Sequence, residues 1–372
     1  MINNINTNEK KIKIAIVGCG RICKNHIKSI LYLSARADLV ALCDNKNENL
    51  IEAKNYLENE SEINSINNKS NINLYNNYNE LIKDYCNCEI KIDLIILATP
   101  SGMHANQAII AAKAGLNVCT EKPMATKWAD GLEMIKAFDN AEKELFVMKQ
   151  NRFNPTLQLV RKQLKKGRFG KISLVAVNVF WHRPQSYYDQ ATWRGTWELD
   201  GGALMNQASH YIDLLDWLIG PVQSLSASTS TIARQIEAED TAAIQLRWKN
   251  GALGTMAVSM ITYPKNLEGS ITILGEEGTV KIGGKAVNDI EYWEFKDKSS
   301  DDDLIKKASY ETTSVYGNGH QAYYENMIDV LEGKDEPMCN GREGLKSLEL
   351  IVAAYESSKT NQLIHLPIES NL

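Results

Sequence analysis

Lys122 and His210 are the side chains whose chemistry and surroundings best suit the oxidation of an alcohol. Lys122 follows AAKAGLNVCT, which predicts a helix end, a glycine turn and a short buried strand, so the lysine leaves the carboxyl end of that strand. Pro123 disfavours the α region for the residue before it, which keeps Lys122 extended. An ammonium there can stabilise negative charge on a reacting oxygen. A surface salt bridge in a turn is the alternative interpretation.

His210 lies near the start of a predicted amphipathic helix in NQASHYIDLLDWLIG. Helical spacing places Asn206, His210 and Asp213 on one side of that helix. The amide of Asn206 and the imidazole of His210 can therefore face one cleft together. A histidine at a helix start is also a common structural residue, which is the alternative here.

The stretch IVGCGRIC combines a β-branched strand, a glycine turn and the start of a helix. Glycines at such a turn let backbone amides approach a pyrophosphate at the helix N-terminus. Cys23 takes the place of the third glycine, where a small side chain still allows the helix to pack on the sheet. The predicted contacts at this turn are Gly18, Cys19, Gly20, Arg21 and Ile22.

Asp44 ends a second predicted strand, about twenty residues after the turn. A carboxylate there can accept both ribose hydroxyls of a dinucleotide and disfavours a 2′-phosphate, so the pattern predicts NAD rather than NADP. The alternative is a glycine turn in an unrelated α/β domain with Asp44 as a helix cap.

ATPSGMHANQA supplies another corner between a strand and a helix. Ligands of open α/β sheets bind outside the carboxyl ends of the strands, so Thr99, Pro100 and His104 are predicted to contact the cofactor, with Glu121 and Lys122 at the next strand. For His104, packing on the sheet from the first turn of its helix is at least as strong an interpretation.

Strands alternate with helices through residue 148, which predicts a doubly wound parallel sheet. After it come long alternating strands with few helices between them, which predict an α+β domain with a large, open, mostly antiparallel sheet. We expect a dinucleotide-binding domain at 1–148 and a substrate-binding and oligomerisation domain at 149–372, with the C-terminal helix packed back on the first domain. The asparagine-rich centre of 45–80 is predicted to be a solvated loop.

Composition narrows the class of protein. The 372 residues carry a net charge of −5, with a pI near 5.8, which argues against a general binder of nucleic acid or anionic membrane. The seven cysteines are odd in number and include no C-x-x-C pair, so we expect reduced thiols, no metal and a cytoplasmic location. No apolar run is long enough to span a membrane.

The glycine turn, ATPSGMHA, EKPMA and GGALMNQASHYIDLLDWLIG together resemble the Gfo/Idh/MocA oxidoreductases over nearly the whole chain. The resemblance implies a Rossmann domain for NAD(P), a second domain for a sugar or cyclitol, and Lys122 at the catalytic centre. It also implies that Trp193 and Arg194 reach the cofactor. Many members have an aspartate where this chain has Asn206; the amide suggests that Asn206 binds substrate while His210 takes the proton.

The runs KQNRFNPT, NVFWHRPQSYYDQATWRGTWELDGG and YPKNLEGSITILGEEGTV are similar to those of UDP-N-acetylglucosaminuronate 3-dehydrogenases. That similarity implies oxidation of the sugar C3 hydroxyl by NAD, on the way to diacetamido-uronic acids of bacterial surface polysaccharide such as O-antigen. It also implies a homo-oligomer, a dimer or tetramer, with 2-oxoglutarate as a candidate second substrate. Candidate ligands for the substrate are Arg152, Asn154, Asn206, Gln207 and Lys265.

Two other functions stay open from the sequence. One is an NAD-dependent dehydrogenase of a free sugar or cyclitol such as an inositol. The other is a non-catalytic nucleotide-sensing protein on the same scaffold, since a fold alone does not fix a function.

Overall fold

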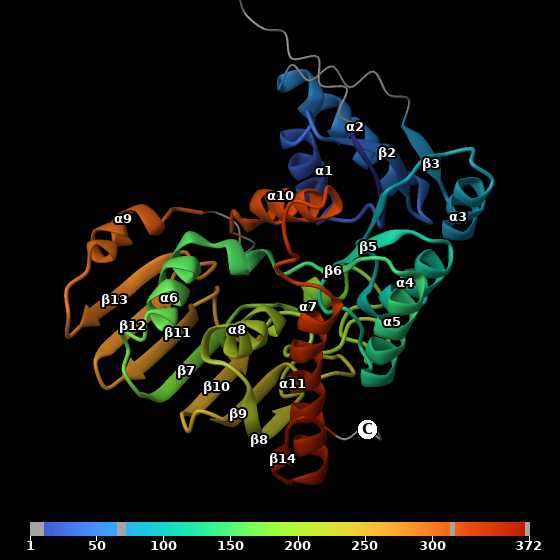
Figure 1. The fold of residues 1–372 in the computed structure, drawn as a ribbon. Coiled ribbons are helices and arrows are strands. Elements are labelled where there is room, and N and C mark those ends of the chain that lie inside the picture. The colour runs from blue at the N-terminus through green and yellow to red at the C-terminus, as the bar shows by residue number, and fades with distance from the viewer. Residues whose placement is uncertain (1–10, 65–71, 313–316, 369–372) are drawn as a thin grey trace, which may run out of the picture.

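The computed structural model describes residues 11–64, 72–312 and 317–368 (Figure 1). Its N-terminal sheet has six parallel strands in the order β3-β2-β1-β4-β5-β6. The strands are β1 (Ile12–Val17), β2 (Ala37–Cys43), β3 (Asn73–Tyr75), β4 (Leu94–Leu97), β5 (Asn117–Thr120) and β6 (Leu145–Val147). The order reverses between β1 and β4, and ligands of doubly wound sheets bind at such a reversal.

Helices cross over between these strands, as a parallel sheet requires. They are α1 (Cys23–Tyr32), α2 (Asn47–Ile63), α3 (Tyr78–Cys86), η1 (Ser101–Met103), α4 (His104–Lys113) and α5 (Trp128–Ala141). Every residue of β4 is buried, because helices cover both faces of the sheet. Gly115 adopts φ +84° just after α4, which confirms the glycine stop read from the sequence.

The C-terminal sheet has eight strands in the order β13-β12-β11-β7-β10-β9-β8-β14. They are β7 (Ile172–Phe180), β8 (Val222–Ser230), β9 (Thr241–Trp248), β10 (Leu253–Ser259), β11 (Glu268–Gly275), β12 (Gly278–Gly283), β13 (Asp289–Phe295) and β14 (Ile364–His365). All neighbouring pairs in it run antiparallel except β7 and β10. The predicted fold class, a parallel Rossmann sheet followed by a mostly antiparallel one, is confirmed.

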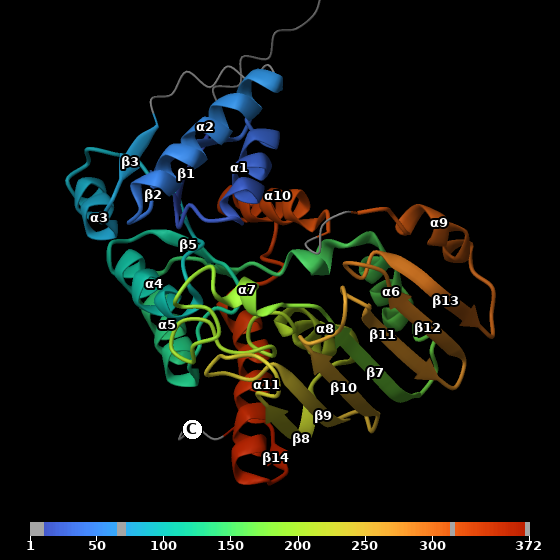
Figure 2. The same cartoon turned by 180° about the vertical axis from the view of Figure 1, so that it is seen from behind.

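One face of the C-terminal sheet is covered by α6 (Pro155–Lys165), α8 (Ser209–Ile219) and α11 (Gly341–Thr360) (Figures 1 and 2). Burial alternates along β9, where Ile244 and Leu246 are buried and Gln245 and Arg247 are exposed. Such alternation places one face of a sheet on the core and leaves the other to solvent or to a partner. Among the described residues, the short elements are η2 (Gln150–Phe153), α7 (Gln185–Tyr188), η3 (Ser300–Leu304) and α9 (Ile305–Ala308).

Two late helices join the two sheets. The helix α10 (Gly319–Leu331) packs on α1 and η2, and α11 packs on α5 and β6 as well as on α8 and β8. C-terminal helices thus contact the N-terminal sheet's layers. The exact division at 148 and 149 stays a prediction.

The loop predicted for the asparagine-rich segment is wrong in part: Ile72, Asn76 and Asn77 are irregular, but regular elements occur beside them. Residues 65–71 lie outside the described part of the chain, but Asn73–Tyr75 form β3, which pairs with β2 at the sheet edge. Asn77 then caps α3 by accepting a hydrogen bond from the backbone N–H of Asn79. Asparagines whose abundance predicted a loop therefore also serve here as an edge-strand residue, Asn73, and a helix cap, Asn77.

Candidate active site

The glycine turn leaves room for a ligand at the carboxyl end of β1. Gly18 adopts φ +97°, and a Cβ added there would lie 2.5 Å from the carbonyl oxygen of Ala98, so only glycine fits. A Cβ at Gly20 would meet no atom within 4 Å, so the space beside it is open. The backbone of this turn therefore fits a dinucleotide pyrophosphate approaching the start of α1.

Asp44 lies beside the same turn. Its Oδ2 accepts a 2.8 Å hydrogen bond from the backbone N–H of Cys19, and Asn49 donates to both carboxylate oxygens at 3.1 Å. These contacts hold the carboxylate at the carboxyl end of β2, the position required of a ribose ligand. Cys23, in place of the third glycine, is buried between helix and sheet.

His104 joins the loops that follow β4 and β5. The buried imidazole has Nδ1 2.9 Å from the carbonyl oxygen of Pro123 and Nε2 2.9 Å from that of Thr99. Burial lowers the pKa of His104, while the hydrogen bonds to these two carbonyls act in the opposite direction. A neutral ring can donate to only one of the two carbonyl oxygens at a time. The hydroxyl of Thr99 donates to Gln107 at 2.6 Å. Both ring nitrogens thus serve to fix these loops, which agrees with the packing interpretation of His104, and a cofactor contact for it stays a prediction.

Lys122 reaches from the end of β5 to the segment before α8. Its Nζ donates a 2.8 Å hydrogen bond to the backbone carbonyl of Asn206, one helical turn before His210. Burial, assisted by the charges of Lys149 and Arg183, lowers the pKa of Lys122 to about 8, while Glu121 and Asp200 act in the opposite direction. The amine therefore keeps its proton at neutral pH but can lose it in mildly alkaline solution.

His210 is buried at the start of α8. Its Nε2 lies 3.4 Å from Nε2 of Gln150, and Nδ1 has no hydrogen-bond partner among the described residues. Burial, with the positive charges of Lys122 and Lys149, lowers the pKa of His210 well below its usual value. The imidazole is therefore neutral and able to accept a proton. The charge of Lys149 acts both on this imidazole and on the Lys122 amine.

Asn206 is held by Asp200, a carboxylate that the sequence reasoning missed. The amide Nδ2 of Asn206 donates a 2.5 Å hydrogen bond to Asp200, whose other oxygen accepts from the backbone N–H of Gly195 at 2.8 Å. Burial raises the pKa of Asp200. Asp200 is thus hydrogen-bonded to the side-chain amide of Asn206, six residues later in the same loop, rather than to His210.

Arg194 links Trp193 to the ring of Tyr187. The guanidinium of Arg194 stacks over Tyr187 at 4.3 Å and over Trp193 at 4.8 Å. Arg21, from the glycine turn, lies 5.5 Å from the centre of the same Tyr187 ring. The Tyr187 ring therefore brings a cation of the cofactor turn together with the predicted Trp–Arg pair.

Other predicted substrate ligands lie in different surroundings. Arg152 is buried and donates two 2.8 Å hydrogen bonds to Asp213. Asn154 donates to the carbonyl of Ala286 at 2.9 Å and is buried as well. Gln207 is buried beside His210, whereas Lys265 is exposed on the loop between β10 and β11. The structure brings Asn206 to the candidate site through its contact with Lys122 and engages Arg152 and Asn154 in other contacts, while a substrate contact for Gln207 stays a prediction.

Two domain models of one protein family together match most of the chain. Residues 12–149 match the NAD-binding Rossmann domain of the oxidoreductase family GFO_IDH_MocA, and residues 161–366 match its C-terminal alpha/beta domain. The chain belongs to the Gfo/Idh/MocA oxidoreductase family. Its N-terminal domain is therefore an NAD-binding domain, and the predicted family and cofactor are confirmed.

Within the Gfo/Idh/MocA family, two solved structures are close to this chain along nearly its full length. The WlbA dehydrogenase of Bordetella pertussis, in complex with NADH and UDP-GlcNAcA, is 53% identical with a TM-score of 0.90, covering 97% of this chain and 99% of that one. The WlbA dehydrogenase of Chromobacterium violaceum, with the same two ligands, is 49% identical with a TM-score of 0.86, covering 99% and 100%. A D-apiose dehydrogenase of Paraburkholderia graminis is 25% identical over 98% of this chain and 92% of its own length.

Lys149 is a further buried cation that the sequence reasoning missed. Its Nζ donates to the hydroxyl of Ser347 at 2.8 Å and lies 3.8 Å from Asp213. Burial lowers the pKa of Lys149, and its charge in turn lowers the pKa of both Lys122 and His210. The available signal was its position directly after the buried run LFVM, where a lysine leaves the carboxyl end of a strand.

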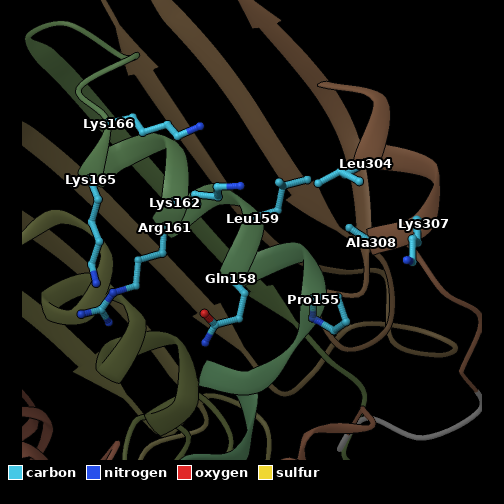
Figure 3. Close-up of a pocket in the computed structure, with 10 residues that line it drawn as sticks. All are labelled: Pro155, Gln158, Leu159, Arg161, Lys162, Lys165, Lys166, Leu304, Lys307 and Ala308. Atoms are coloured by element: carbon cyan, nitrogen blue, oxygen red, sulfur yellow. The ribbon is translucent and has the colours of Figure 1, made fainter. Parts of the chain in front are cut away.

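A hollow of about 730 Å³ between α6 and α9 lies outside this site (Figure 3). Leu159 and Leu304 point toward each other across it, and lysines surround its rim. Two of them, Lys162 and Lys166, bind the carboxylate of Asp301 at 2.6 Å. The residues predicted for cofactor and substrate do not line it.

Within the described ranges, no helix is long and apolar enough to cross a membrane, and no group of acidic, histidine or cysteine side chains is arranged to hold a metal ion. All seven cysteines are free thiols.

Proposed function

We propose that this protein oxidises the C3 hydroxyl of UDP-N-acetylglucosaminuronate to the 3-keto sugar nucleotide, with NAD as the hydride acceptor. The observation that carries the proposal is 53% and 49% identity, along nearly the whole chain, to two dehydrogenases whose structures hold NADH and UDP-GlcNAcA. Identity at that level extends through both domains rather than the cofactor domain alone. The candidate site supplies a base and a cation suited to this reaction.

His210 takes the hydroxyl proton in this proposal. The amide Nε2 of Gln150 can only donate a hydrogen bond, so it faces the lone pair of His210 Nε2. The substrate hydroxyl replaces this 3.4 Å contact and gives its proton to the same lone pair. Because burial keeps the imidazole neutral, that lone pair is available throughout the neutral range. NAD supplies the other half of the oxidation by accepting the hydride from C3.

Lys122 stabilises the oxygen from which the proton leaves. Its ammonium is anchored by the carbonyl of Asn206, one helical turn before His210. A cation held in a desolvated site stabilises a developing alkoxide far better than water does, and removing such a donor costs about 10²–10³ in rate. Asn206 and Gln207 then orient the sugar, and Arg194 meets an anionic group of cofactor or substrate.

The assay is NADH formation by the purified protein with UDP-N-acetylglucosaminuronate and NAD, followed by mass analysis of the sugar product. We expect a product two hydrogens lighter than the substrate, and loss of activity in Lys122→Met. A protein that binds NAD but leaves the substrate intact would contradict the proposal.

A free sugar or cyclitol as substrate is tested by UDP itself. Ligands that bind the native state raise its apparent stability, so UDP at saturation should raise the Tm if the site accepts a sugar nucleotide. An unchanged Tm, together with turnover of an inositol, would favour a free sugar or cyclitol as the substrate. Adding 2-oxoglutarate to the assay tests whether bound NADH is reoxidised in place.

We also infer a homo-oligomer, formed through the uncovered face of the C-terminal sheet. Side chains on that face include the exposed Leu174 and Leu253 on neighbouring strands β7 and β10. Covering such a face is a common use of symmetric association. Light scattering should give the mass of a dimer or tetramer, and the mass of one chain would contradict the inference.

A further inference from the structure

A buried chain of three side chains leads to the residue next to Lys122. Tyr324 of α10 has its hydroxyl 2.9 Å from Nδ1 of His26 in α1, and Nε2 of that histidine lies 3.3 Å from Oε1 of Glu121 after β5. Tyr324 and His26 are completely buried, and the side chain of Glu121 is 12% exposed. Apart from this 3.3 Å contact, neither His26 Nε2 nor Glu121 Oε1 has a partner among the described residues.

Proton positions in this chain follow from what each group can do. Burial raises the pKa of Tyr324 well above its usual value, so its hydroxyl keeps its proton and donates to Nδ1 of His26. With Nδ1 accepting, Nε2 carries the ring proton and faces the Glu121 carboxylate, which can only accept when ionised. Tyr324 thereby selects the histidine tautomer that suits an anionic Glu121.

Glu121 is ionised in this setting although it is little exposed. Burial favours its neutral form, but the interaction with the Nε2–H of His26, assisted by the charge of Lys122, outweighs burial and lowers the pKa of Glu121 to about 2. Its Oε2 also accepts the backbone N–H of Lys122 at 3.2 Å. The carboxylate is therefore fixed beside the catalytic lysine at both oxygens.

The charge of Glu121 acts on the lysine that follows it in the chain, whose backbone N–H the carboxylate binds. Burial and the neighbouring cations favour the neutral amine, and Glu121 is the first contribution that opposes them. We propose that Tyr324 and His26 are positioning residues that hold Glu121 as an oriented carboxylate, and that this carboxylate keeps Lys122 in the ammonium form. The assignment of Lys122 to the reaction rests on the proposed function; the protonation of Lys122 does not.

A purely structural role for the chain is the competing explanation, because Tyr324 and His26 also pack α10 on α1. Tyr323 provides a matched control. Its hydroxyl is equally buried on the same helix and donates to the carbonyls of Val147 and Cys339, outside the Tyr324–His26–Glu121 chain. Tyr323→Phe and Tyr324→Phe thus each remove one buried hydroxyl group from α10, but the two hydroxyls have different hydrogen-bond partners.

The direct experiment measures the protonation of Lys122 without substrate. Trace acetic anhydride reacts with the free amine, and the extent of acetylation at Lys122, read by peptide mass spectrometry against pH, gives the midpoint of its titration. Glu121→Gln should move that midpoint down by about one pH unit or more, because an adjacent opposite charge is lost. Tyr324→Phe should move it in the same direction by less, and Tyr323→Phe should leave it unchanged.

An unmoved midpoint in folded Glu121→Gln would overturn the proposal, and so would equal shifts in Tyr323→Phe and Tyr324→Phe. Circular dichroism of each variant establishes that it is folded, and Glu121→Gln decides the question if Tyr324→Phe does not fold. In the assay with UDP-N-acetylglucosaminuronate, the alkaline limb of kcat/KM should move to lower pH in step with the labelling midpoint. If the wild type turns nothing over, the proposed function fails while the labelling result still stands.

Discussion

The amine of Lys122 and the backbone carbonyl of Asn206 are joined by a 2.8 Å hydrogen bond that spans 84 residues of sequence. The bond ties the carboxyl end of β5, in the NAD-binding sheet, to the turn that begins α8 on the other sheet. The lysine is thereby placed with respect to His210 by the backbone rather than by another flexible side chain. A backbone acceptor carries no full charge, so this hydrogen bond forms no ion pair with the ammonium, which remains able to stabilise a reacting oxygen.

The pH dependence of oxidation should show one limb, on the alkaline side. Burial lowers the pKa of Lys122 to about 8, and the proposed mechanism needs its protonated form, so kcat/KM should fall about tenfold per pH unit above that value. Burial lowers the pKa of His210 well below its usual value, so this base stays neutral and contributes no acid limb near pH 6.5. Initial rates of NADH formation from about pH 6 to about pH 10 would show the alkaline limb and reveal an acid limb if one exists.

Lys122→Arg is the control for that profile. A guanidinium stays charged throughout the range, so the alkaline limb should disappear even though the altered geometry lowers the rate. An alkaline limb that persists unchanged in Lys122→Arg would assign it to another group.

Local patterns were sufficient to predict the corners of the NAD-binding sheet. Gly18, Asp44 and Lys122 each follow a run of apolar residues, and parallel strands bring their carboxyl ends to one edge, so sequence order alone places them together. Predicting that Lys122 and His210 lie together also required the family resemblance, because helix and strand periodicity do not say which elements of two different sheets meet.

Partners distant in the chain were beyond the same reasoning. Arg152 looked available for an anionic ligand, yet Asp213, 61 residues away, binds it in the interior. The contact between His26 and Tyr324 spans 298 residues and depends on how α10 packs on α1. No periodicity encodes such a pairing; only the tertiary arrangement of the helices creates it.

Arg152 and Asp213 should contribute to stability as a pair. Removing one member leaves an uncompensated buried charge, so Arg152→Met should lower the free energy of unfolding by about 3–5 kcal/mol. The double variant Arg152→Met, Asp213→Leu should recover only part of that loss, because both charges of the pair are gone but Lys149 and Glu343 lose their contacts with Asp213 and Arg152. Denaturant unfolding of the two single variants and the double variant measures the coupling. A raised KM in Arg152→Met with unchanged stability would instead support the predicted contact with substrate.

Asp44 should determine the choice between NAD and NADP. Its carboxylate lies at the end of β2, where it would repel a 2′-phosphate, so Asp44→Asn should raise the ratio of kcat/KM for NADP to that for NAD on the order of tenfold. Asparagine keeps an oxygen that can accept the N–H of Cys19, which separates the loss of charge from the loss of the turn. The ratio would stay at the wild-type value if the ribose bound elsewhere.

Gly18 and Gly20 should respond differently to the same added methyl group. Gly18→Ala forces a Cβ to within 2.5 Å of the Ala98 carbonyl at φ +97°, so we expect a loss of about 1–3 kcal/mol in the free energy of unfolding. Gly20→Ala meets no protein atom within 4 Å and should unfold like the wild type to within about 0.5 kcal/mol. Because its methyl group would occupy the space for the pyrophosphate, Gly20→Ala should nevertheless bind NADH on the order of tenfold more weakly in a fluorescence titration. Wild-type NADH affinity in Gly20→Ala would show that the pyrophosphate does not approach this turn.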